Sequence, residues 1–155
     1  MIIVDANLLI YATNSDLPEH STARSFIDMQ LSGAVHLGLP WLVVVAFVRL
    51  TTNRRVFERP LSVQESLAIV NGWLQLSSVE MINPGPSHWQ TLSRLLMRSG
   101  TAGNLTNDAH LAAIAIDHGA LICSADNDFK RFEGVQHYNP IHDHEGIKEP
   151  LLVYR

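Results

Sequence analysis

Short apolar runs alternate along the chain with longer segments in which apolar residues recur at helical spacing. The short runs are typical of buried strands, because they place a few apolar residues between polar or turn-forming ones. The longer segments place apolar residues three or four positions apart, as on one face of a helix. This pattern predicts strands over 1–5, 34–39, 78–84, 120–126 and 134–139, and helices over 6–15, 20–30, 61–76, 87–100 and 104–119.

Local signals support two of these helices. Ser62 and Glu65 stand three residues apart, as in a capping box, and the helix they begin places Leu67, Val70 and Leu74 along one face. A glycine follows the last of the predicted helices and is its expected stop. Alternation of strands and helices implies a parallel sheet with helices on both faces.

The segment 40–57 is ambiguous from its pattern alone. Val43, Val44 and Val45 favour a strand, whereas the unbroken length and Pro40 as a first-turn residue favour a helix. We predict a helix.

Length and composition predict one domain over residues 1–155. The chain has 155 residues, of which 46% are hydrophobic, enough for a single substantial core. The longest uncharged apolar stretch, 37–48, is too short to cross a bilayer, and no basic segment precedes the first apolar residues. We therefore expect a cytoplasmic protein with no membrane partner. Cys123, the single cysteine, lies in an apolar run and is expected to be a core residue.

The charge distribution is uneven. The formal net charge of −4 argues against broad, nonspecific binding to nucleic acids. Four arginines nevertheless lie within eleven residues, namely Arg49, Arg54, Arg55 and Arg59. They are either solvated cations near a helix end or a surface that contacts phosphates.

Aspartates follow two of the predicted strands. Asp5 ends the apolar run 2–4, and Asp126 follows the run 121–123. Asp108 lies at the start of the helix that precedes the second of these strands. Because ligands of parallel sheets bind beyond the carboxyl ends of the strands, we expect these three carboxylates to converge.

Three converging carboxylates repel one another. Each pair about 5 Å apart costs about 3 kcal/mol at an effective dielectric constant near ~20, and three pairs cost about 10 kcal/mol. This is comparable with the whole stability of a domain, so protons or a cation must offset it. Ligands that are all oxygen suit Mg²⁺ or Mn²⁺, which assist hydrolysis of phosphodiesters.

Each aspartate also has a purely structural interpretation. Asp5 is placed to cap the following helix, Asp108 to interact with its own helix dipole, and Asp126 to form a turn with Asn127. These interpretations do not explain why two strands end alike.

Four segments in order resemble the PIN-domain ribonucleases, specifically the VapC-type toxins of VapBC toxin–antitoxin systems. They are VDANLLIYA, FVRLTTNRRVF, GNLTNDAHLAAIAIDHGA and SADNDFKRFEGVQHYNP, which together span most of the chain. The resemblance implies a three-layer α/β/α sandwich around a parallel sheet. It also implies Mg²⁺-dependent endonucleolytic cleavage of RNA, commonly a structured RNA of the translation apparatus.

By this resemblance, Asp5, Asp108 and Asp126 match the acids that bind the metal. Asn7 and Ser124 match groups that orient those acids. Asp128 shares the role of Asp126 or caps the short helix 128–132, and Arg49 matches a basic residue near the site.

One position departs from the family pattern. Where these toxins usually carry a glutamate three residues before the arginine, this chain has Ala46. Loss of that carboxylate is expected to lower both metal affinity and turnover. Two origins are open: a deliberate inactivating replacement, which we favour, and a natural member with weakened catalysis.

The resemblance also implies partners. Such toxins dimerise and bind a VapB-type antitoxin over a hydrophobic groove, which the run 41–48 would help to line. A different hypothesis is a catalytically inactive module that titrates antitoxin or occupies operator DNA. A phosphatase or DNA nuclease with the same metal cluster differs only in its substrate.

Other polar and aromatic residues have plainer interpretations. His137, His142 and His144 lack cysteine partners and are interpreted as part of a solvated tail. His110 is two residues from Asp108 and would face differently on a helix, so it is not expected to share a metal. The tryptophans at 41, 73 and 89 are interpreted as core or interface residues.

Overall fold

A computed structural model describes residues 1–143 of the protein. Five short parallel strands form its centre. The strand order is β3-β2-β1-β4-β5, and every neighbouring pair is parallel. The central strand β1 is fully buried, which explains its three consecutive branched apolar residues. The strands are β1 (Ile2–Val4), β2 (Leu37–Pro40), β3 (Val79–Ile82), β4 (Leu121–Cys123) and β5 (Gln136–Tyr138).

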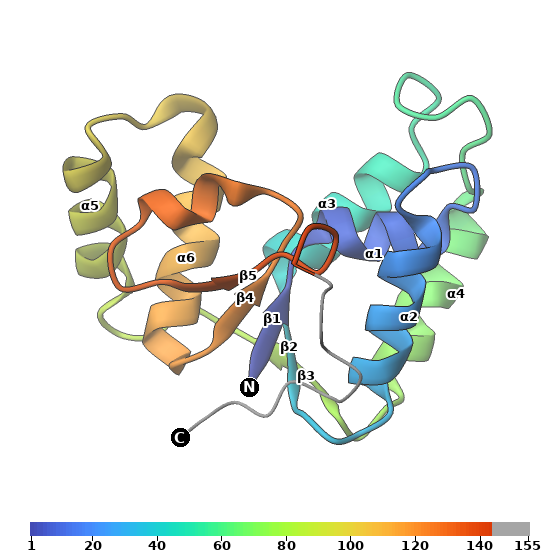
Figure 1. Cartoon of the computed structure of the whole chain (residues 1–155), viewed down its shortest axis with the longest axis horizontal. Helices are drawn as coiled ribbons and strands as arrows, with labels where there is room; N and C mark the ends of the chain where they lie inside the picture. The colour runs from blue at the N-terminus through green and yellow to red at the C-terminus, as the bar shows by residue number, and fades with distance from the viewer. Residues whose placement is uncertain (144–155) are drawn as a thin grey trace.

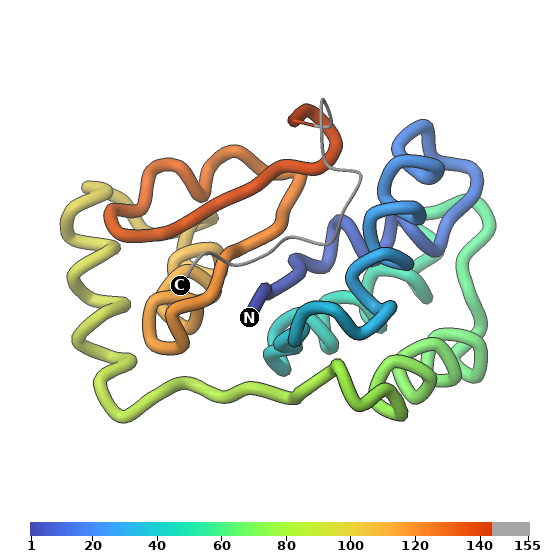
Figure 2. The backbone as a smooth tube through the Cα atoms, turned by 60° about the horizontal axis from the view of Figure 1, so that its bottom comes forward, coloured from blue at the N-terminus to red at the C-terminus, as the bar shows by residue number. Residues whose placement is uncertain are grey.

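Helices cover both faces of this sheet. Helices α5 and α6 lie on one side, whereas α1, α2 and α4 lie on the other (Figures 1 and 2). The predicted α/β/α sandwich with a parallel sheet is thus confirmed. The helices are α1 (Ala6–Thr13), α2 (His20–Leu31), α3 (Trp41–Thr51), α4 (Val63–Leu74), α5 (His88–Ser99) and α6 (Thr106–His118), with short 3₁₀ helices η1 (Gly103–Leu105) and η2 (Asn127–Arg131).

The ambiguous segment forms helix α3, as predicted, but it ends at Thr51 and not near residue 57. The Thr51 hydroxyl donates to the carbonyl of Phe47 and lies 2.9 Å from the Ser66 hydroxyl of α4. Side-chain bonds of this kind compete with the helical pattern. The basic segment beyond Thr51 is therefore a loop.

Helix α4 begins with the predicted capping box. The Ser62 hydroxyl accepts from the Glu65 amide, and the Glu65 carboxylate accepts from the Ser62 amide. The expected apolar face is only partly correct, because Val70 is buried whereas Leu67 and Leu74 are exposed. The helix lies at the outside of its layer, and its buried residues are Ser66 and Val70.

The middle of helix α6 is buried. Six of its residues are buried, all of them alanine, leucine or isoleucine, because the helix packs against both α5 and the sheet. Gly119 ends the helix in the left-handed region at φ 59°, where a side chain would be strained, so the predicted stop is confirmed.

The remaining apolar residues divide between core and surface. Cys123 is fully buried in β4, as expected, and burial raises the pKa of its thiol. Trp73 packs edge-on against Phe47 with ring centroids 4.8 Å apart. Trp41 and Trp89 are 57% and 73% exposed, which excludes the core alternative for these two and leaves the interface alternative as a prediction. No helix within residues 1–143 is both long enough and apolar enough to cross a bilayer.

The side of β1 on which the chain adds new strands changes after β3. Strands β2 and β3 lie on one side of β1, whereas β4 and β5 lie on the other. In open parallel sheets, ligands bind at the carboxyl ends of the strands where this reversal occurs. Here that point lies between the ends of β1 and β4.

Candidate active site

Asp5 stands at the end of β1 and is held by three hydrogen bonds. It is the N-cap of α1, where its Oδ1 accepts from the Ala6 amide at 2.7 Å. Its Oδ2 accepts from the Ser124 hydroxyl at 2.7 Å and from the Asn7 amide group at 3.0 Å. Burial raises the pKa of Asp5, an effect that its bonds to Ser124 and Ala6 oppose. The structural interpretation of Asp5 as a cap is correct, and its other oxygen joins two segments of the site.

Ser124 links Asp5 to the loop that carries Asp126. While its hydroxyl donates to Asp5, the same oxygen accepts from the Asp126 amide at 3.0 Å. Asn7 adds a second link, because its side-chain oxygen accepts from the Ala125 amide at 3.2 Å. Asn7 and Ser124 therefore hold the Asp5 carboxylate and the backbone of the Asp126 loop, and their role in orienting metal ligands stays a prediction.

Asp126 is the N-cap of η2, because its Oδ1 accepts from the Asp128 amide at 2.8 Å. Of the two roles open for Asp128, capping this helix is therefore wrong, and a share in the role of Asp126 stays a prediction. Asp128 lies in the first turn of η2. Its carboxylate forms an ion pair at 3.0 Å with Arg131, three residues further along the chain. The cap is Asp126, two residues before Asp128, and the turn predicted for Asp126 and Asn127 is present.

Asp108 lies in the first turn of α6 and is half-buried. Its pKa is raised to about 6, first by burial and then by the negative charges of Asp126, Asp5 and Asp128. Acids from three distant parts of the chain therefore interact electrostatically at this edge of the sheet.

A cavity of about 330 Å³ opens beside these acids. Asp5 and Asp108 line it together with Ala46, so the position of the missing glutamate faces the same space as two of the acids. Aliphatic side chains from α3 and the aromatic rings of Tyr11 and Phe57 form much of the remaining wall. Of the run 41–48, Leu42, Val43 and Ala46 line this cavity, whereas the contribution of the run to an antitoxin groove stays a prediction.

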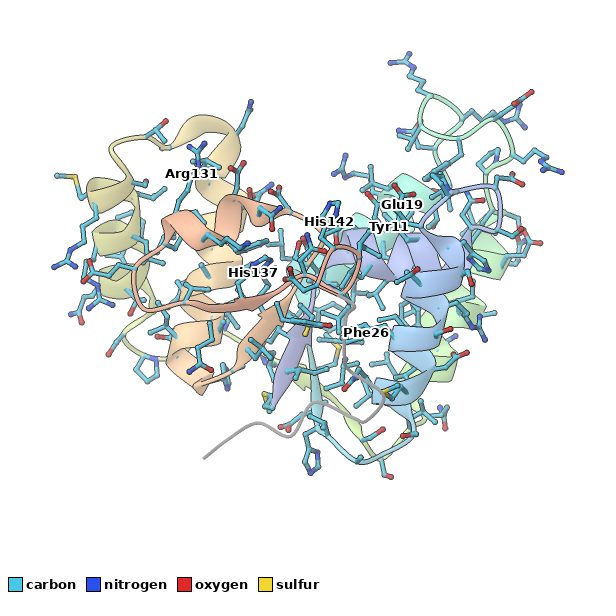
Figure 3. All side chains as sticks on the ribbon, in the orientation of Figure 1. Tyr11, Glu19, Phe26, Arg131, His137 and His142 are labelled. Atoms are coloured by element: carbon cyan, nitrogen blue, oxygen red, sulfur yellow. The ribbon has the colours of Figure 1, made fainter. Side chains whose placement is uncertain are left out.

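The negative charge of this region also affects the pKa of Tyr11. Its pKa is raised by burial and then by the negative charges of Glu19, Asp5 and Asp126. Tyr11 and Glu19 lie close together at the end of the α1 layer (Figure 3). No sequence signal marked Tyr11, because a tyrosine on an apolar helix face looks like any core residue.

The donor set suits a hard divalent cation, although the described residues 1–143 do not preform a cage for one. Among residues 1–143, no three histidine, cysteine, aspartate or glutamate side chains stand ready to hold one ion. Mg²⁺ usually keeps several waters and binds one or two carboxylates, so it does not require a full protein cage. The pKa of Asp108 is raised first by burial and then by the neighbouring acids, and a bound cation would offset the second of these causes. The residues present therefore fit Mg²⁺ or Mn²⁺.

Arg49 is exposed in the last turn of α3, where its charge complements the helix dipole. It does not line the cavity.

Asn139 fixes the loop of Asp126 from the opposite side. It is fully buried, and its amide nitrogen donates to the Ala125 carbonyl at 3.0 Å and to the Asn127 side chain at 3.3 Å. These two residues flank Asp126, so Asn139 holds the chain on both sides of the acid. Its side-chain oxygen accepts from two further amides, those of Ile141 and His142. Sequence reasoning missed this residue.

His137 was wrongly assigned to a solvated tail. It lies in β5, its Nε2 is 3.1 Å from the Ser124 carbonyl, and its ring stacks on Phe129 of η2. Figure 3 shows His137 in this position and His142 in the turn that follows the strand. His142 is exposed, in agreement with the expectation, and His144 lies outside the described residues.

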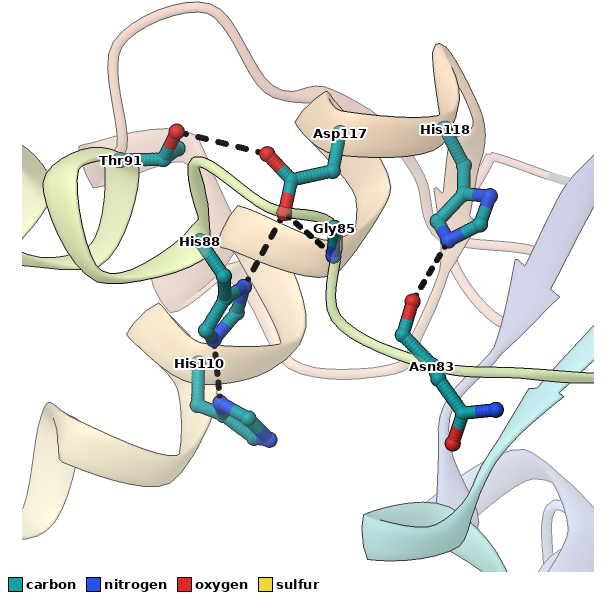
Figure 4. A network of polar contacts seen from close by, with 7 residues as sticks. All are labelled: Asn83, Gly85, His88, Thr91, His110, Asp117 and His118. Carbon is teal, nitrogen blue, oxygen red and sulfur yellow. Dashed lines mark hydrogen bonds and ion pairs between the residues drawn. The ribbon is translucent and has the colours of Figure 1, made fainter.

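His110 faces away from the acids, as expected. Its Nδ1 is 2.8 Å from Nε2 of His88, whose Nδ1 is 3.1 Å from Asp117 (Figure 4). Asp117 also accepts from the Gly85 amide and the Thr91 hydroxyl. This network joins α5 to α6 and explains how His110 is satisfied without a metal.

Comparison with known proteins gives consistent matches over almost the whole chain. A family model described as PIN domain matches residues 2–135. The chain is 45% identical over 140 residues to Ribonuclease VapC37 of Mycobacterium tuberculosis, which covers 90% of this chain and 97% of that protein. It is 36% identical over 143 residues to Ribonuclease VapC33 of the same species, which covers 92% and 100%.

Solved structures share the fold at lower identity. VapBC2 from Rickettsia felis, bound to a DNA fragment from its promoter, matches with a TM-score of 0.63 and 20% identity, covering 90% of this chain and 98% of that chain. VapC20 of M. tuberculosis, a sarcin–ricin loop cleaving toxin, matches with a TM-score of 0.63 and 17% identity, covering 84% and 93%.

Proposed function

The chain belongs to the PIN-domain family and is a VapC-type PIN ribonuclease, and on that premise we propose that it is the toxin of a type II toxin–antitoxin pair that cleaves RNA internally with Mg²⁺. Its relatives at 45% and 36% identity are both named ribonucleases and are matched over nearly their full lengths. The observation that carries the proposal is the meeting of Asp5, Asp108 and the Asp126 loop at the point where the strand order reverses.

Asp5, Asp108 and Asp126 would hold the ion, with Mn²⁺ as an alternative. When bound there, a divalent cation lowers the pKa of a water molecule and offsets the charge that develops on the phosphate. Ser124 and Asn7 keep the Asp5 carboxylate oriented. The aliphatic and aromatic side chains in the cavity wall lower the local dielectric constant, which strengthens the interaction between the acids and a bound group.

The proposed substrate is a structured RNA of the translation apparatus, as the family resemblance implies. VapC20, which shares the fold, is described as a sarcin–ricin loop cleaving toxin. The arrangement of acids is suited to a phosphodiester and does not select one RNA sequence.

The proposed partner is a VapB-type antitoxin. Solved structures with this fold include VapBC from Salmonella typhimurium bound to DNA and VapBC-1 from Haemophilus influenzae. An antitoxin arginine that reached Asp5 and Asp108 would form charge-assisted hydrogen bonds and compete with the metal. We further propose that the toxin is a homodimer, as is usual for the family.

Ala46 supports a second candidate function. A methyl group lines the cavity at the place where the family usually has a carboxylate. A chain with too little metal affinity would serve as a catalytically inactive module that binds antitoxin or regulates its operator. Such a module would need neither metal nor cleavage.

Incubation of the purified chain with total RNA, with Mg²⁺ and then with EDTA, separates these functions. We expect slow cleavage with Mg²⁺, none with EDTA, and loss of cleavage in Asp5→Asn. Asp28→Asn is a matched control, because Asp28 lies on the surface of α2 in an ion pair with Arg24. Cleavage that persists in EDTA, or equally in Asp5→Asn, would reject the metal-dependent nuclease.

A further inference from the structure

The loop between α3 and α4 is a fixed turn that borders the acid cavity. Asn53 organises it, because its side-chain oxygen accepts from the Arg55 amide at 2.8 Å. Its backbone carbonyl accepts from the amides of Val56 and Phe57 at 3.0 and 3.1 Å. The loop projects from the end of α3, beside the segment that joins α1 to α2 (Figure 1). Its shape is thus set by local hydrogen bonds, and it can present side chains in fixed directions.

The two halves of this turn have different chemistry. Val56 and Phe57 line the cavity that also contains Asp5 and Asp108. Arg54 and Arg55, directly before them, are exposed, and neither forms an ion pair with any residue in the described part of the chain. Two unneutralised guanidinium groups therefore stand within two residues of the wall of the acid cavity.

The nearby charges leave this rim positive. Arg59 pairs with Asp16 at 2.6 Å across the neighbouring loop, and Glu58 is exposed. Arg49 adds another exposed cation from the last turn of α3. The Asp16 carboxylate of the neighbouring loop is thus already paired, and three exposed arginines, Arg49, Arg54 and Arg55, face one carboxylate of this segment, Glu58.

A polyanion is the ligand that this arrangement fits. The chain as a whole carries a net charge of −4, and the cavity contains carboxylates, so both repel a nucleic acid at long range. Cations at the rim of the cavity offset that repulsion where a strand must approach. Guanidinium groups also bind phosphate oxygens in a bidentate manner, which an ammonium group cannot do.

We propose that the turn 53–57 binds the RNA backbone, with Arg54 and Arg55 contacting phosphates next to the bond that is cleaved. This inference rests on the proposed function, because it assigns the site an RNA substrate. It concerns binding and not chemistry, and it can therefore be tested without cleavage.

The salt dependence of binding gives a quantitative expectation. Each phosphate contact to a single strand contributes about −0.7 to the slope of log K against log salt concentration. Arg54→Gln/Arg55→Gln should therefore reduce the magnitude of the slope by about 1.4. If the two proteins converge near ~1 M salt, the double variant binds roughly 60-fold more weakly at ~50 mM salt and roughly tenfold more weakly at ~200 mM.

Fluorescence anisotropy with a labelled single-stranded RNA in EDTA measures this slope while preventing metal-dependent cleavage. Arg24→Gln/Arg98→Gln is the matched control, because it removes the same charge from arginines paired with Asp28 and Glu133. We expect a reduced slope only in the loop variant. Arg54→Lys/Arg55→Lys keeps the charge and should restore most of the slope.

The outcomes are distinguishable. RNA binding with the same slope in the loop variant and the control would overturn this inference and leave the proposed function standing. A wild-type chain that binds no RNA would overturn both. If the loop variant lost affinity for an acidic peptide such as oligoglutamate but bound RNA normally, the turn would serve a protein partner and the inference would again be wrong.

Discussion

Restoring the missing carboxylate by Ala46→Glu tests whether the family pattern applies to this site. Ala46 is half-buried and lines the cavity together with Asp5 and Asp108. A glutamate there would add one negative charge to a site in which the pKa of Asp108 is already raised to about 6. The variant should therefore be less stable without metal and more active with it.

The expected cost follows from Coulomb's law. A new carboxylate about 5 Å from each of two acids is repelled by about 3 kcal/mol per pair at an effective dielectric constant near ~20. A glutamate side chain can turn toward solvent, so we expect a remaining cost of about 1–2 kcal/mol. For a protein of this size, this lowers the melting temperature by roughly 5 °C.

Bound metal should reverse this loss. We expect Mg²⁺ to raise the melting temperature of Ala46→Glu more than that of the wild type, because the ion binds the folded state more tightly. RNA cleavage should rise at least about a hundredfold, which is the scale for restoring a group that orients a metal site.

The assay compares Ala46→Glu with Ala46→Gln, which has the same size and no charge. Cleavage of total RNA is followed with and without Mg²⁺, the cut ends are mapped, and melting temperatures are measured in parallel. If the glutamate and glutamine variants have the same activity and the same response to Mg²⁺, position 46 does not carry the missing acid.

Three further changes test the surroundings of the acids. Asp108→Asn should stabilise the metal-free protein by about 1 kcal/mol at pH 8, because the raised pKa means that the charged carboxylate disfavours the folded state above pH 6; calorimetry should show this gain shrinking toward pH 4, and a gain independent of pH would contradict the electrostatic cause. Ser124→Ala should weaken Mn²⁺ binding by about 10- to 100-fold, whereas Ser66→Ala, an equally buried serine far from the acids, should not; equal titrations would exclude an orienting role. Asn139→Ala should speed hydrogen exchange of the Asp128 amide but not of amides in α4, and unchanged exchange would show that the loop is held by other contacts.

The layer structure was predictable because it depends on repeated patterns. Alternating strands and helices predicted the parallel sheet, and both the capping box at Ser62 and the stop at Gly119 have local causes. The end of α3 was harder, because the Thr51 hydroxyl bonds to α4, a contact that no local pattern contains. Exposure of Leu67 and Trp89 likewise depends on how far each helix lies from the sheet.

The acids were predictable from their places at strand and helix ends, but the groups that hold them were less so. Asp5 and Asp126 both cap helices, as their structural interpretations predicted or allowed, and their role as metal ligands stays a prediction. Asn139 and His137 contact the Asp126 loop from β5 and the turn after it, far along the chain. Only the pairing of β4 with β5 brings them there.

Calorimetric titration with Mn²⁺ tests most directly whether the carboxylates at this sheet edge bind a divalent ion. We expect one ion per chain in the wild type and at least about tenfold weaker binding in Asp126→Asn, whereas Asp28→Asn should bind as the wild type does. If the wild type binds no ion, or if Asp126→Asn binds as tightly as the wild type, the acids at the ends of β1 and β4 are not a metal centre.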